Sequence, residues 1–295
     1  MLDRSSIKID VDAVICDRVP GLARFIPKWA TGWLARVICQ DRMNRLLEEN
    51  RGLEGADFCR GVLASLRIST ELTNAGKLPP KEDRRVVFVS NHPLGGLDGM
   101  ALIDIIQAHF GGQVWFIVND LLMAVKPLNN VFLPINKHGA QSRKAAADIE
   151  RAFAGDDPVI IFPAGLCSRL KKTSFLGKRC RQIADLRWNK MFVNKCIQHR
   201  RDVIPLFFSG QNSDHFYRVA LNRKRLRIPF NLEMIYLPQE IFMAEGKSFR
   251  VIVGDRIPHD TLAGGKEAQG SADTIRSMTY LLDKESIDAP LFHKS

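Results

Sequence analysis

The sequence predicts an α/β protein with a mixed, largely parallel central sheet flanked by helices and preceded by an N-terminal amphipathic helical segment. Short apolar runs, typical of strands buried on both faces, alternate with longer helical patterns, as in chains built from βαβ units. The chain has 295 residues, of which 45% are hydrophobic and 25% charged, so it can bury a sizeable core and has the composition of a globular protein.

Strands are predicted at runs of four to six residues that are wholly or mostly apolar. These runs are Val86–Val89, Val114–Val118, Val159–Phe162, Val203–Phe208, Leu232–Leu237 and Phe249–Val253. Helices are predicted where apolar residues recur every three or four positions. The helical stretches are Leu97–His109, Gln141–Ala154, Ser213–Asn222 and Ala272–Asp283, the last preceded by a glycine-containing loop at Thr261–Gly270.

The N-terminal segment, residues 1–80, is predicted to be helical and is divided from an α/β domain over residues 81–295 by polar punctuation at Leu78–Asp83. Within it, Trp29 and Trp33 belong to an apolar face with helical spacing, and the opposite face is basic. A basic amphipathic helix with two tryptophans can lie in a membrane interface. It can equally pack on the main domain, and the pattern does not choose between the two.

The charge of the chain is concentrated. Between Leu166 and Arg201 there are eleven basic residues and one acid, Asp185, so this stretch carries ten of the net eleven positive charges. A second cluster at Arg218–Arg227 has five basic residues and no acid. Such clusters favour an anionic partner, which can be membrane headgroups, nucleic acid or an acidic carrier protein, over a solvated face without a partner.

No apolar run reaches the roughly 18 residues that a membrane-spanning helix needs, and the charged N-terminus is unlike a secretory signal. The six cysteines form no CxxC pair, which favours reduced thiols over disulfides or a zinc site. We therefore expect a cytoplasmic protein without a transmembrane helix. An N-terminal amphipathic helix that lies in a membrane interface would place it peripherally on the inner face of the cytoplasmic membrane.

The candidate catalytic residues are His92 and Asp98, in the run SNHPLGGLDG at residues 90–99. They flank a tight loop between a predicted strand and a predicted helix, where open α/β sheets bind ligands. His92 can remove a proton from a hydroxyl while Asp98 holds its other ring nitrogen, and Gly95 and Gly96 let the loop bend. A purely structural hydrogen bond between the two side chains is the alternative.

The chain has no GxSxG elbow, no phosphate-binding GxxxxGK[ST] loop, no GxGxxG after a strand and no HExxH. Since no serine elbow accompanies His92, a base at that position is expected to activate a hydroxyl of the substrate rather than one of the enzyme.

The run NHPLGGLDG after an apolar strand resembles the first motif of the glycerolipid (lysophospholipid) acyltransferase superfamily. That family places four residues between His and Asp, whereas five lie between His92 and Asp98. The longer loop is similar to that of bacterial ornithine-lipid and glycine-lipid O-acyltransferases. Further matches follow in the family's order: residues 131–137 resemble its second motif, 160–169 its third and 203–206 its fourth.

The resemblance implies that His92, oriented by Asp98, deprotonates the acceptor hydroxyl, which then attacks a fatty acyl thioester of acyl carrier protein or coenzyme A. This chemistry requires no metal and no cofactor beyond the co-substrate. It implies a substrate site formed by Asn91, Gly95, Gly96, Lys137, Ala164, Gly165, Ser168 and Arg169. Backbone N–H groups of the loop or of Gly165 are the candidates for stabilising the oxyanion.

The third motif departs from the family pattern. Ala164 takes the place of the family's Glu and Cys167 that of its Arg, although Arg169 follows two residues later. Because the family's two residues help to bind glycerol 3-phosphate-type acceptors, the loss of a guanidinium favours a lyso amino-acid lipid such as lyso-ornithine or lyso-glycine lipid. A 1-acylglycerol-3-phosphate acyltransferase is the alternative. We expect Cys167 to be a packing residue.

Under this interpretation the basic stretch contacts acyl carrier protein, coenzyme A phosphates or anionic lipid, and Trp29 and Trp33 seat the chain on the membrane. The basic contact residues are Lys171, Lys172, Lys178, Arg179 and Arg181. A basic nucleic-acid-binding protein is a less favoured alternative, since no recognised nucleic-acid motif is present, and we expect no nucleic acid partner. A catalytically dead relative is disfavoured because His92 and Asp98 are both retained.

Overall fold

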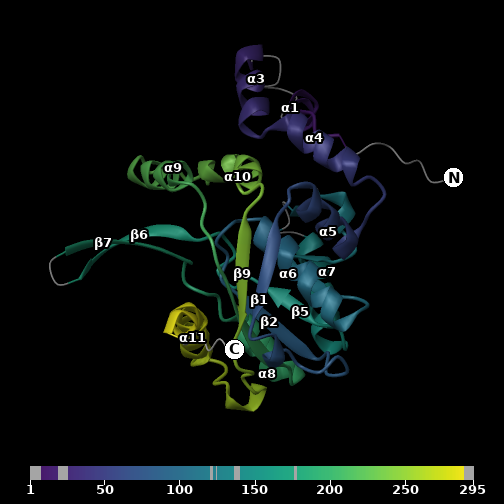
Figure 1. The fold of residues 1–295 in the computed structure, drawn as a ribbon, viewed down its shortest axis with the longest axis vertical. Helices are drawn as coiled ribbons and strands as arrows, with labels where there is room; N and C mark the ends of the chain where they lie inside the picture. The colour runs from purple at the N-terminus through teal and green to yellow at the C-terminus, as the bar shows by residue number, and fades with distance from the viewer. Residues whose placement is uncertain are drawn as a thin grey trace, which may run out of the picture.

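The computed structural model describes residues 8–18, 26–119, 122–123, 125–135, 140–175 and 178–288. The predicted fold class is confirmed, because helices flank a seven-stranded, mostly parallel sheet with the order β1-β9-β8-β2-β5-β3-β4 (Figure 1). Its strands are β1 (Ser69–Thr73), β2 (Val86–Ser90), β3 (Trp115–Asn119), β4 (Phe132–Ile135), β5 (Val159–Ile161), β8 (Asp202–Phe208) and β9 (Ser248–Val253). An antiparallel hairpin of β6 (Arg169–Phe175) and β7 (Lys178–Ala184) projects from the body.

Helices cover both faces of the sheet. The α-helices are α1 (Val11–Arg18), α3 (Lys28–Val37), α4 (Gln40–Glu49), α5 (Gly55–Ser65), α6 (Leu97–Phe110), α7 (Ala140–Ala154), α8 (Met191–His199), α9 (Asp214–Arg225), α10 (Leu237–Met243) and α11 (Ala268–Asp288). Short 3₁₀ helices are η1 (Ala75–Lys77), η3 (Lys126–Leu128), η4 (Leu232–Tyr236) and η5 (His259–Thr261).

The sheet has a topological switch point at β2, where successive connections lead to opposite sides of the strand. This strand lies between β5 and β8 and is parallel to both, so their carboxyl ends meet at one edge. From β2 the chain runs to β3 on the β5 side, whereas from β5 it passes to β8 on the other side of β2. Such a switch point opens a crevice outside the carboxyl ends of the strands, which is the usual ligand site of open α/β sheets.

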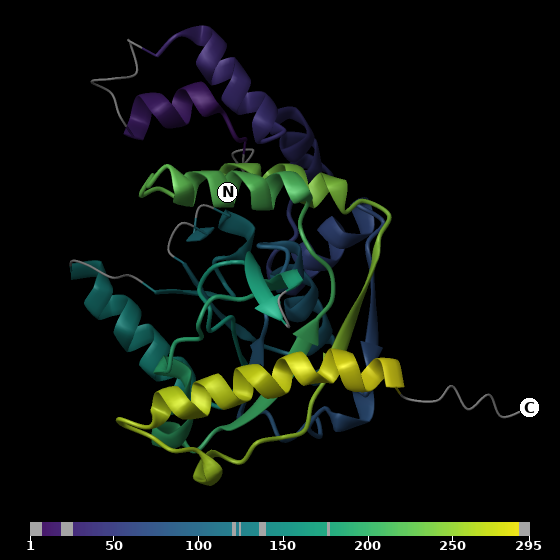
Figure 2. The same cartoon turned by 90° about the vertical axis from the view of Figure 1, so that its left-hand side faces the viewer.

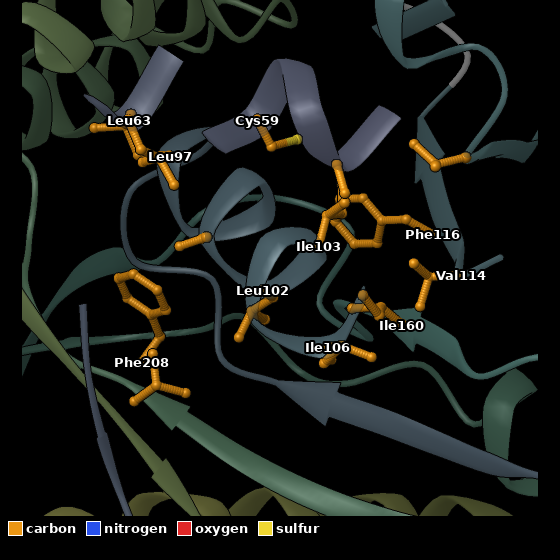
Figure 3. Close-up of a cluster of buried hydrophobic side chains, with 14 of the residues drawn as sticks. Cys59, Leu63, Leu97, Leu102, Ile103, Ile106, Val114, Phe116, Ile160 and Phe208 are labelled. Carbon is orange, nitrogen blue, oxygen red and sulfur yellow. The ribbon is translucent and has the colours of Figure 1, made fainter. Parts of the chain in front are cut away.

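The core lies on both faces of the central strands, which explains why their sequences are apolar throughout. In β2, Val86 and Phe88 face a cluster built with α5 and α6, whereas Val87 and Val89 face one built with α7, α8 and α11. Figure 3 shows the first cluster, with Cys59 of α5 close to side chains of α6 and the sheet. This packing fixes the first turn of α6 and the loop that precedes it.

The predicted strand at Leu232–Leu237 is wrong. These residues form η4 and the first residue of α10, and Pro238 lies in the first turn of α10. A short apolar run does not distinguish a strand from a helix. The run also contains Glu233, which is completely buried between two arginines.

The boundary predicted at residue 80 falls inside the α/β unit. Strand β1 pairs with β9 along its full length, and α5 belongs to the same core cluster as α6. Helices α1, α3 and α4 gather at one end of the molecule (Figures 1 and 2). In the ranges that the structure describes, no helix has the length and apolar character needed to cross a membrane.

Candidate active site

A His–Asp pair stands just beyond the carboxyl end of β2, as the sequence predicts. The Nδ1 atom of His92 lies 2.8 Å from Oδ2 of Asp98, which is in the first turn of α6. The Asp98 side chain is completely buried, whereas 14% of the His92 side chain is exposed. A base must be reachable by its substrate while its orienting acid stays out of water, and the two exposures meet both requirements.

Asp98 is held as an ionised hydrogen-bond acceptor. Its Oδ2 accepts the Leu94 N–H at 2.9 Å, and its Oδ1 accepts the N–H groups of Gly96 at 3.1 Å and Gly99 at 3.0 Å. Burial alone would raise the pKa of Asp98, but His92 and the hydrogen bonds outweigh burial and place that pKa below its ordinary value of 3.8. Since the carboxylate can only accept, Nδ1 of His92 carries the proton and Nε2 is the basic nitrogen.

The loop between the two residues needs glycine at position 95. Gly95 has a φ of +77°, and a Cβ there would lie 2.7 Å from the side chain of Leu237. Gly96 is the N-cap residue of α6 and donates its N–H to Asp98. Gly95 therefore allows a sharp turn against α10, as expected from the conformational freedom of glycine, whereas a Cβ at Gly96 would meet only Ile241 at 3.8 Å.

Residues of the third motif contact both the ring and the backbone of His92. The ring of Phe162, which follows β5, stacks on the imidazole with centroids 4.1 Å apart and an interplanar angle of 16°. The backbone carbonyl of His92 accepts the Ser168 N–H at 2.7 Å. These contacts fix both the ring plane and the backbone of His92.

Asp185 is a further site residue, one that our sequence reasoning missed. Its buried Oδ1 accepts the His92 backbone N–H at 3.1 Å and the Ser168 hydroxyl at 2.6 Å, and its Oδ2 accepts the Trp188 indole N–H at 2.8 Å. The Asp185 N–H donates to the Tyr280 hydroxyl of α11 at 2.8 Å. Its signal in the sequence is that it is the one acid in the basic stretch.

Replacement of Asp185 by Asn is expected to lower kcat at least about tenfold with little change in KM, because the amide NH₂ must face at least one of the three donors and the resulting shift of residue 185 moves the group that holds the His92 backbone. The free energy of unfolding should fall by about 1–3 kcal/mol. Steady-state kinetics at matched folded fraction measures the first effect. Asp202→Asn, which disturbs a carboxylate bonded to His259, is the control. A wild-type kcat in Asp185→Asn would contradict the positioning role.

Three expected substrate contacts are instead structural. The amide nitrogen of Asn91 donates to the Phe208 carbonyl at 2.8 Å, and its amide oxygen accepts the Phe208 N–H at 2.7 Å. Asn91 thereby joins the end of β2 to β8. Ser168 is buried and gives its hydroxyl to Asp185. The Gly165 N–H donates to the Phe162 carbonyl at 3.0 Å, so it is not available to an oxyanion. Of the remaining positions, Ala164 packs partly buried against the core, and Lys137 lies outside the described residues.

Arg169 is also engaged within the protein, contrary to the expectation that it contacts substrate. Its guanidinium bonds the Glu233 carboxylate at 2.8 Å and the Cys167 carbonyl at 2.7 Å. Arg223 pairs with the other oxygen of Glu233 at 2.9 Å. Burial raises the pKa of the Cys167 thiol to about 11, so it is a thiol at neutral pH and fits the predicted packing role.

Comparison with known proteins identifies the family. Residues 13–290 match the acyltransferase family. The chain belongs to this family. Two curated relatives, each named lyso-glycine lipid O-acyltransferase, come from Bacteroides thetaiotaomicron and Phocaeicola vulgatus. Both are 38% identical to this chain over 282 residues, which is 96% of it and 100% and 98% of their own lengths.

The acyltransferase was also compared with solved structures. The crystal structure of the 1-acyl-sn-glycerophosphate acyltransferase PlsC from Thermotoga maritima is 14% identical, covers 95% of this chain and 98% of its own, and has a TM-score of 0.46. The resemblance to the glycerolipid acyltransferase superfamily and the enzymatic class predicted from the ordered motifs are confirmed by the family match and the curated relatives.

The basic stretch of the acyltransferase is not one surface. Arg201 is completely buried and donates to the backbone carbonyls of Phe153 at 2.7 Å and Asp157 at 2.8 Å, and burial lowers its pKa to about 10. It therefore cannot meet a partner. Lys171 is exposed on β6. Further along the hairpin, Lys172, Lys178, Arg179 and Arg181 occupy positions on β6 and β7, and their side chains lie outside the described part of the chain.

The acyltransferase has a polar cavity of about 280 Å³ on the flank of the catalytic loop. Leu94 and Leu97 line it together with polar residues that include Asn212 and Glu240, but His92 does not. Within the described ranges, His, Cys, Asp and Glu form no group of three or more that could hold a metal. The cavity therefore adjoins the loop between His92 and Asp98 but is not lined by His92.

Proposed function

We propose that this acyltransferase moves a fatty acyl group from a thioester to the hydroxyl of a lyso amino-acid lipid, with His92 as the base. The geometry of the His92–Asp98 pair carries the proposal. Because Nδ1 is bonded to a buried carboxylate, Nε2 is the nitrogen left to act on an acceptor hydroxyl.

In the proposed reaction the hydroxyl proton passes to Nε2 of His92 as the oxygen attacks the thioester carbonyl carbon. The carbon–sulfur bond then breaks, and the leaving sulfur takes the proton back from Nε2. Asp98 stabilises the positive imidazole between these steps without accepting its proton. Phe162, stacked on the ring, keeps Nε2 in a constant direction during both transfers.

Two observations support a lyso-glycine or lyso-ornithine lipid as the acceptor. The third motif carries Ala164 and Cys167, and the nearby guanidinium of Arg169 is already bound to Glu233 rather than free to clamp a phosphate. The two curated relatives bear the name of a lyso-glycine lipid O-acyltransferase. The 1-acylglycerol-3-phosphate acceptor is the rival in the same chemistry.

The proposed partners are an acyl carrier protein or coenzyme A thioester and an anionic membrane surface. Trp29 and Trp33 of α3 are 75% and 47% exposed, which supports an interfacial helix rather than one packed on the body through these side chains. Partial burial and the charge of Arg276, with a smaller effect of Lys224, lower the pKa of Lys171 by more than the Asp185 carboxylate raises it, so positive charge from three elements gathers at the hairpin. An acidic donor complex would relieve this repulsion.

Side-by-side transfer assays test the acceptor. We expect transfer to lyso-glycine or lyso-ornithine lipid at least about tenfold faster in kcat/KM than to lysophosphatidic acid, because no phosphate clamp stands in the third motif. Each acceptor is offered with labelled acyl-carrier-protein and coenzyme A thioesters. Transfer to lysophosphatidic acid alone would reject the acceptor and keep the chemistry. Transfer to none of them, by folded protein, would reject the proposal.

A further inference from the structure

The segment from the end of α9 to the first residue of η4, residues 226–232, holds large apolar side chains in water. Leu226 is 70% exposed, Phe230 73% and Leu232 37%. They lie where the chain turns from α9 to η4, which we call the α9–η4 tip, whereas Leu221, Met234 and Tyr236 pack in the cluster of Phe216 and Tyr217. An exposed apolar cluster of this kind marks a contact with a membrane or a partner.

Basic side chains surround this tip. Lys224, Arg225 and Arg227 are exposed, and no acid occurs between residues 215 and 232. Apolar side chains flanked by several cations are complementary to the interface of an anionic bilayer, where acyl chains lie beneath phosphate groups.

Internal hydrogen bonds keep the loop from folding back on the protein. Helix α9 ends in a Schellman motif, with Arg227 at a φ of +55° and the Ile228 N–H bonded to the Arg223 carbonyl at 3.1 Å. The Arg223 guanidinium in turn donates to the Ile228 carbonyl at 3.1 Å and pairs with Glu233. Leu226 and Phe230 are therefore presented outward by a fixed backbone.

The tip lies at the same end of the molecule as α1 and α3, whose Trp29 and Trp33 are exposed (Figures 1 and 2). We propose that residues 224–232 form a second membrane contact, in which Leu226 and Phe230 enter the interface of an anionic bilayer while Lys224, Arg225 and Arg227 bind lipid phosphates. The α9–η4 tip and α3 then hold the enzyme on the membrane at two points.

The tip is joined to the catalytic loop through ion pairs and hydrogen bonds. Glu233 binds both Arg223, which fixes the tip, and Arg169, which bonds the Cys167 carbonyl. The next residue, Ser168, bonds the His92 backbone. Binding of the tip to a bilayer thus fixes the position of His92 relative to the lipids. That this serves a lipid acceptor rests on the proposed function.

Vesicle partitioning tests the inference, without donor or acceptor present, so its outcome is independent of the proposed reaction. The probes are vesicles of phosphatidylcholine with phosphatidylglycerol and vesicles of phosphatidylcholine alone. Leu226→Ser/Phe230→Ser is expected to weaken partitioning to the mixed vesicles about tenfold or more. Lys224→Glu/Arg225→Glu should weaken it similarly and remove the preference for anionic lipid, and Phe230→Trp should retain binding.

Matched controls lie on and before α11, away from the tip. Leu281→Ser removes an apolar side chain that is 49% exposed, and Lys266→Glu reverses an exposed charge; both should partition like the wild type. The inference is overturned if Leu226→Ser/Phe230→Ser partitions normally while Trp29→Ser/Trp33→Ser loses all binding. It is overturned equally if the controls lose as much, or if the tip variants lose affinity for acyl carrier protein or DNA but not for vesicles. Circular dichroism checks that each variant is folded.

Discussion

Replacement of His92 by Ala is expected to reduce acyl transfer by about a thousandfold, since general base catalysis contributes roughly 10²–10⁴ in rate. The variant loses the nitrogen that accepts the hydroxyl proton but keeps the loop, because Asp98 retains its three backbone donors. The lost Nδ1 hydrogen bond should lower the free energy of unfolding by only about 1–3 kcal/mol. Single-turnover transfer of a labelled acyl chain, with urea unfolding alongside, measures both effects.

The molecule offers a matched control for this experiment. His259 makes the same kind of bond, with its Nδ1 2.8 Å from Oδ1 of Asp202, at the opposite end of β8 from the catalytic loop. His259→Ala should therefore lose comparable stability and keep its transfer rate. Wild-type transfer by His92→Ala, or an equal loss in His259→Ala, would show that His92 is not the base.

Replacement of Asp98 by Asn should lower transfer by a similar factor, about a thousandfold, and should also destabilise the fold. An amide NH₂ at Oδ2 would oppose the Leu94 N–H and would donate to Nδ1 of His92. The imidazole proton would then move to Nε2, which could no longer accept one from the hydroxyl. A buried donor left without a partner costs about 1–3 kcal/mol. Normal transfer by folded Asp98→Asn would reject the orienting role.

The same variant should change how stability depends on pH. Because the pKa of Asp98 is lower in the folded chain than its ordinary 3.8, the folded state binds fewer protons in acid. This contribution to stability is present at pH values above the ordinary pKa and is lost as the pH falls toward the folded-state pKa. The free energy of unfolding in urea should thus decline less steeply with acidification in Asp98→Asn, and an unchanged slope would contradict the assignment.

The central strands were predictable because they are buried on both faces, which leaves a run such as Val86–Val89 apolar at every position. Strand β1 was not predicted, since most of its residues are exposed or half-buried and its pairing with β9 joins residues far apart in the sequence. The hairpin of β6 and β7 was not predicted, because its many basic residues break the apolar runs by which strands are recognised. The short run at Leu232–Leu237 matched a strand in composition and became helical in its tertiary context.

The residues of the site likewise include some that the sequence reveals and some that it does not. His92 and Asp98 are six positions apart, so one loop brings them together and the sequence displays the pair. Asp185 and Glu233 act across 93 and 64 positions, and no local pattern connects either to its partner. Each nevertheless left a trace, since Asp185 is the one acid in the basic stretch and Glu233 stands inside an apolar run, where a buried carboxylate needs a partner to offset its desolvation.

The hydrogen bond from Asp185 to Tyr280 has a consequence for how the enzyme is made. Tyr280 lies on α11, which follows every strand of the sheet in the chain. During synthesis the strands and the catalytic loop leave the ribosome before α11 does, and Asp185 gains its last support only when α11 docks. A nascent chain stalled before residue 280 would keep the contacts of the His92–Asp98 loop but would lack the bond from the Asp185 N–H to Tyr280. This link between the site and the rest of the fold therefore forms only after α11 has been made and has docked on the sheet.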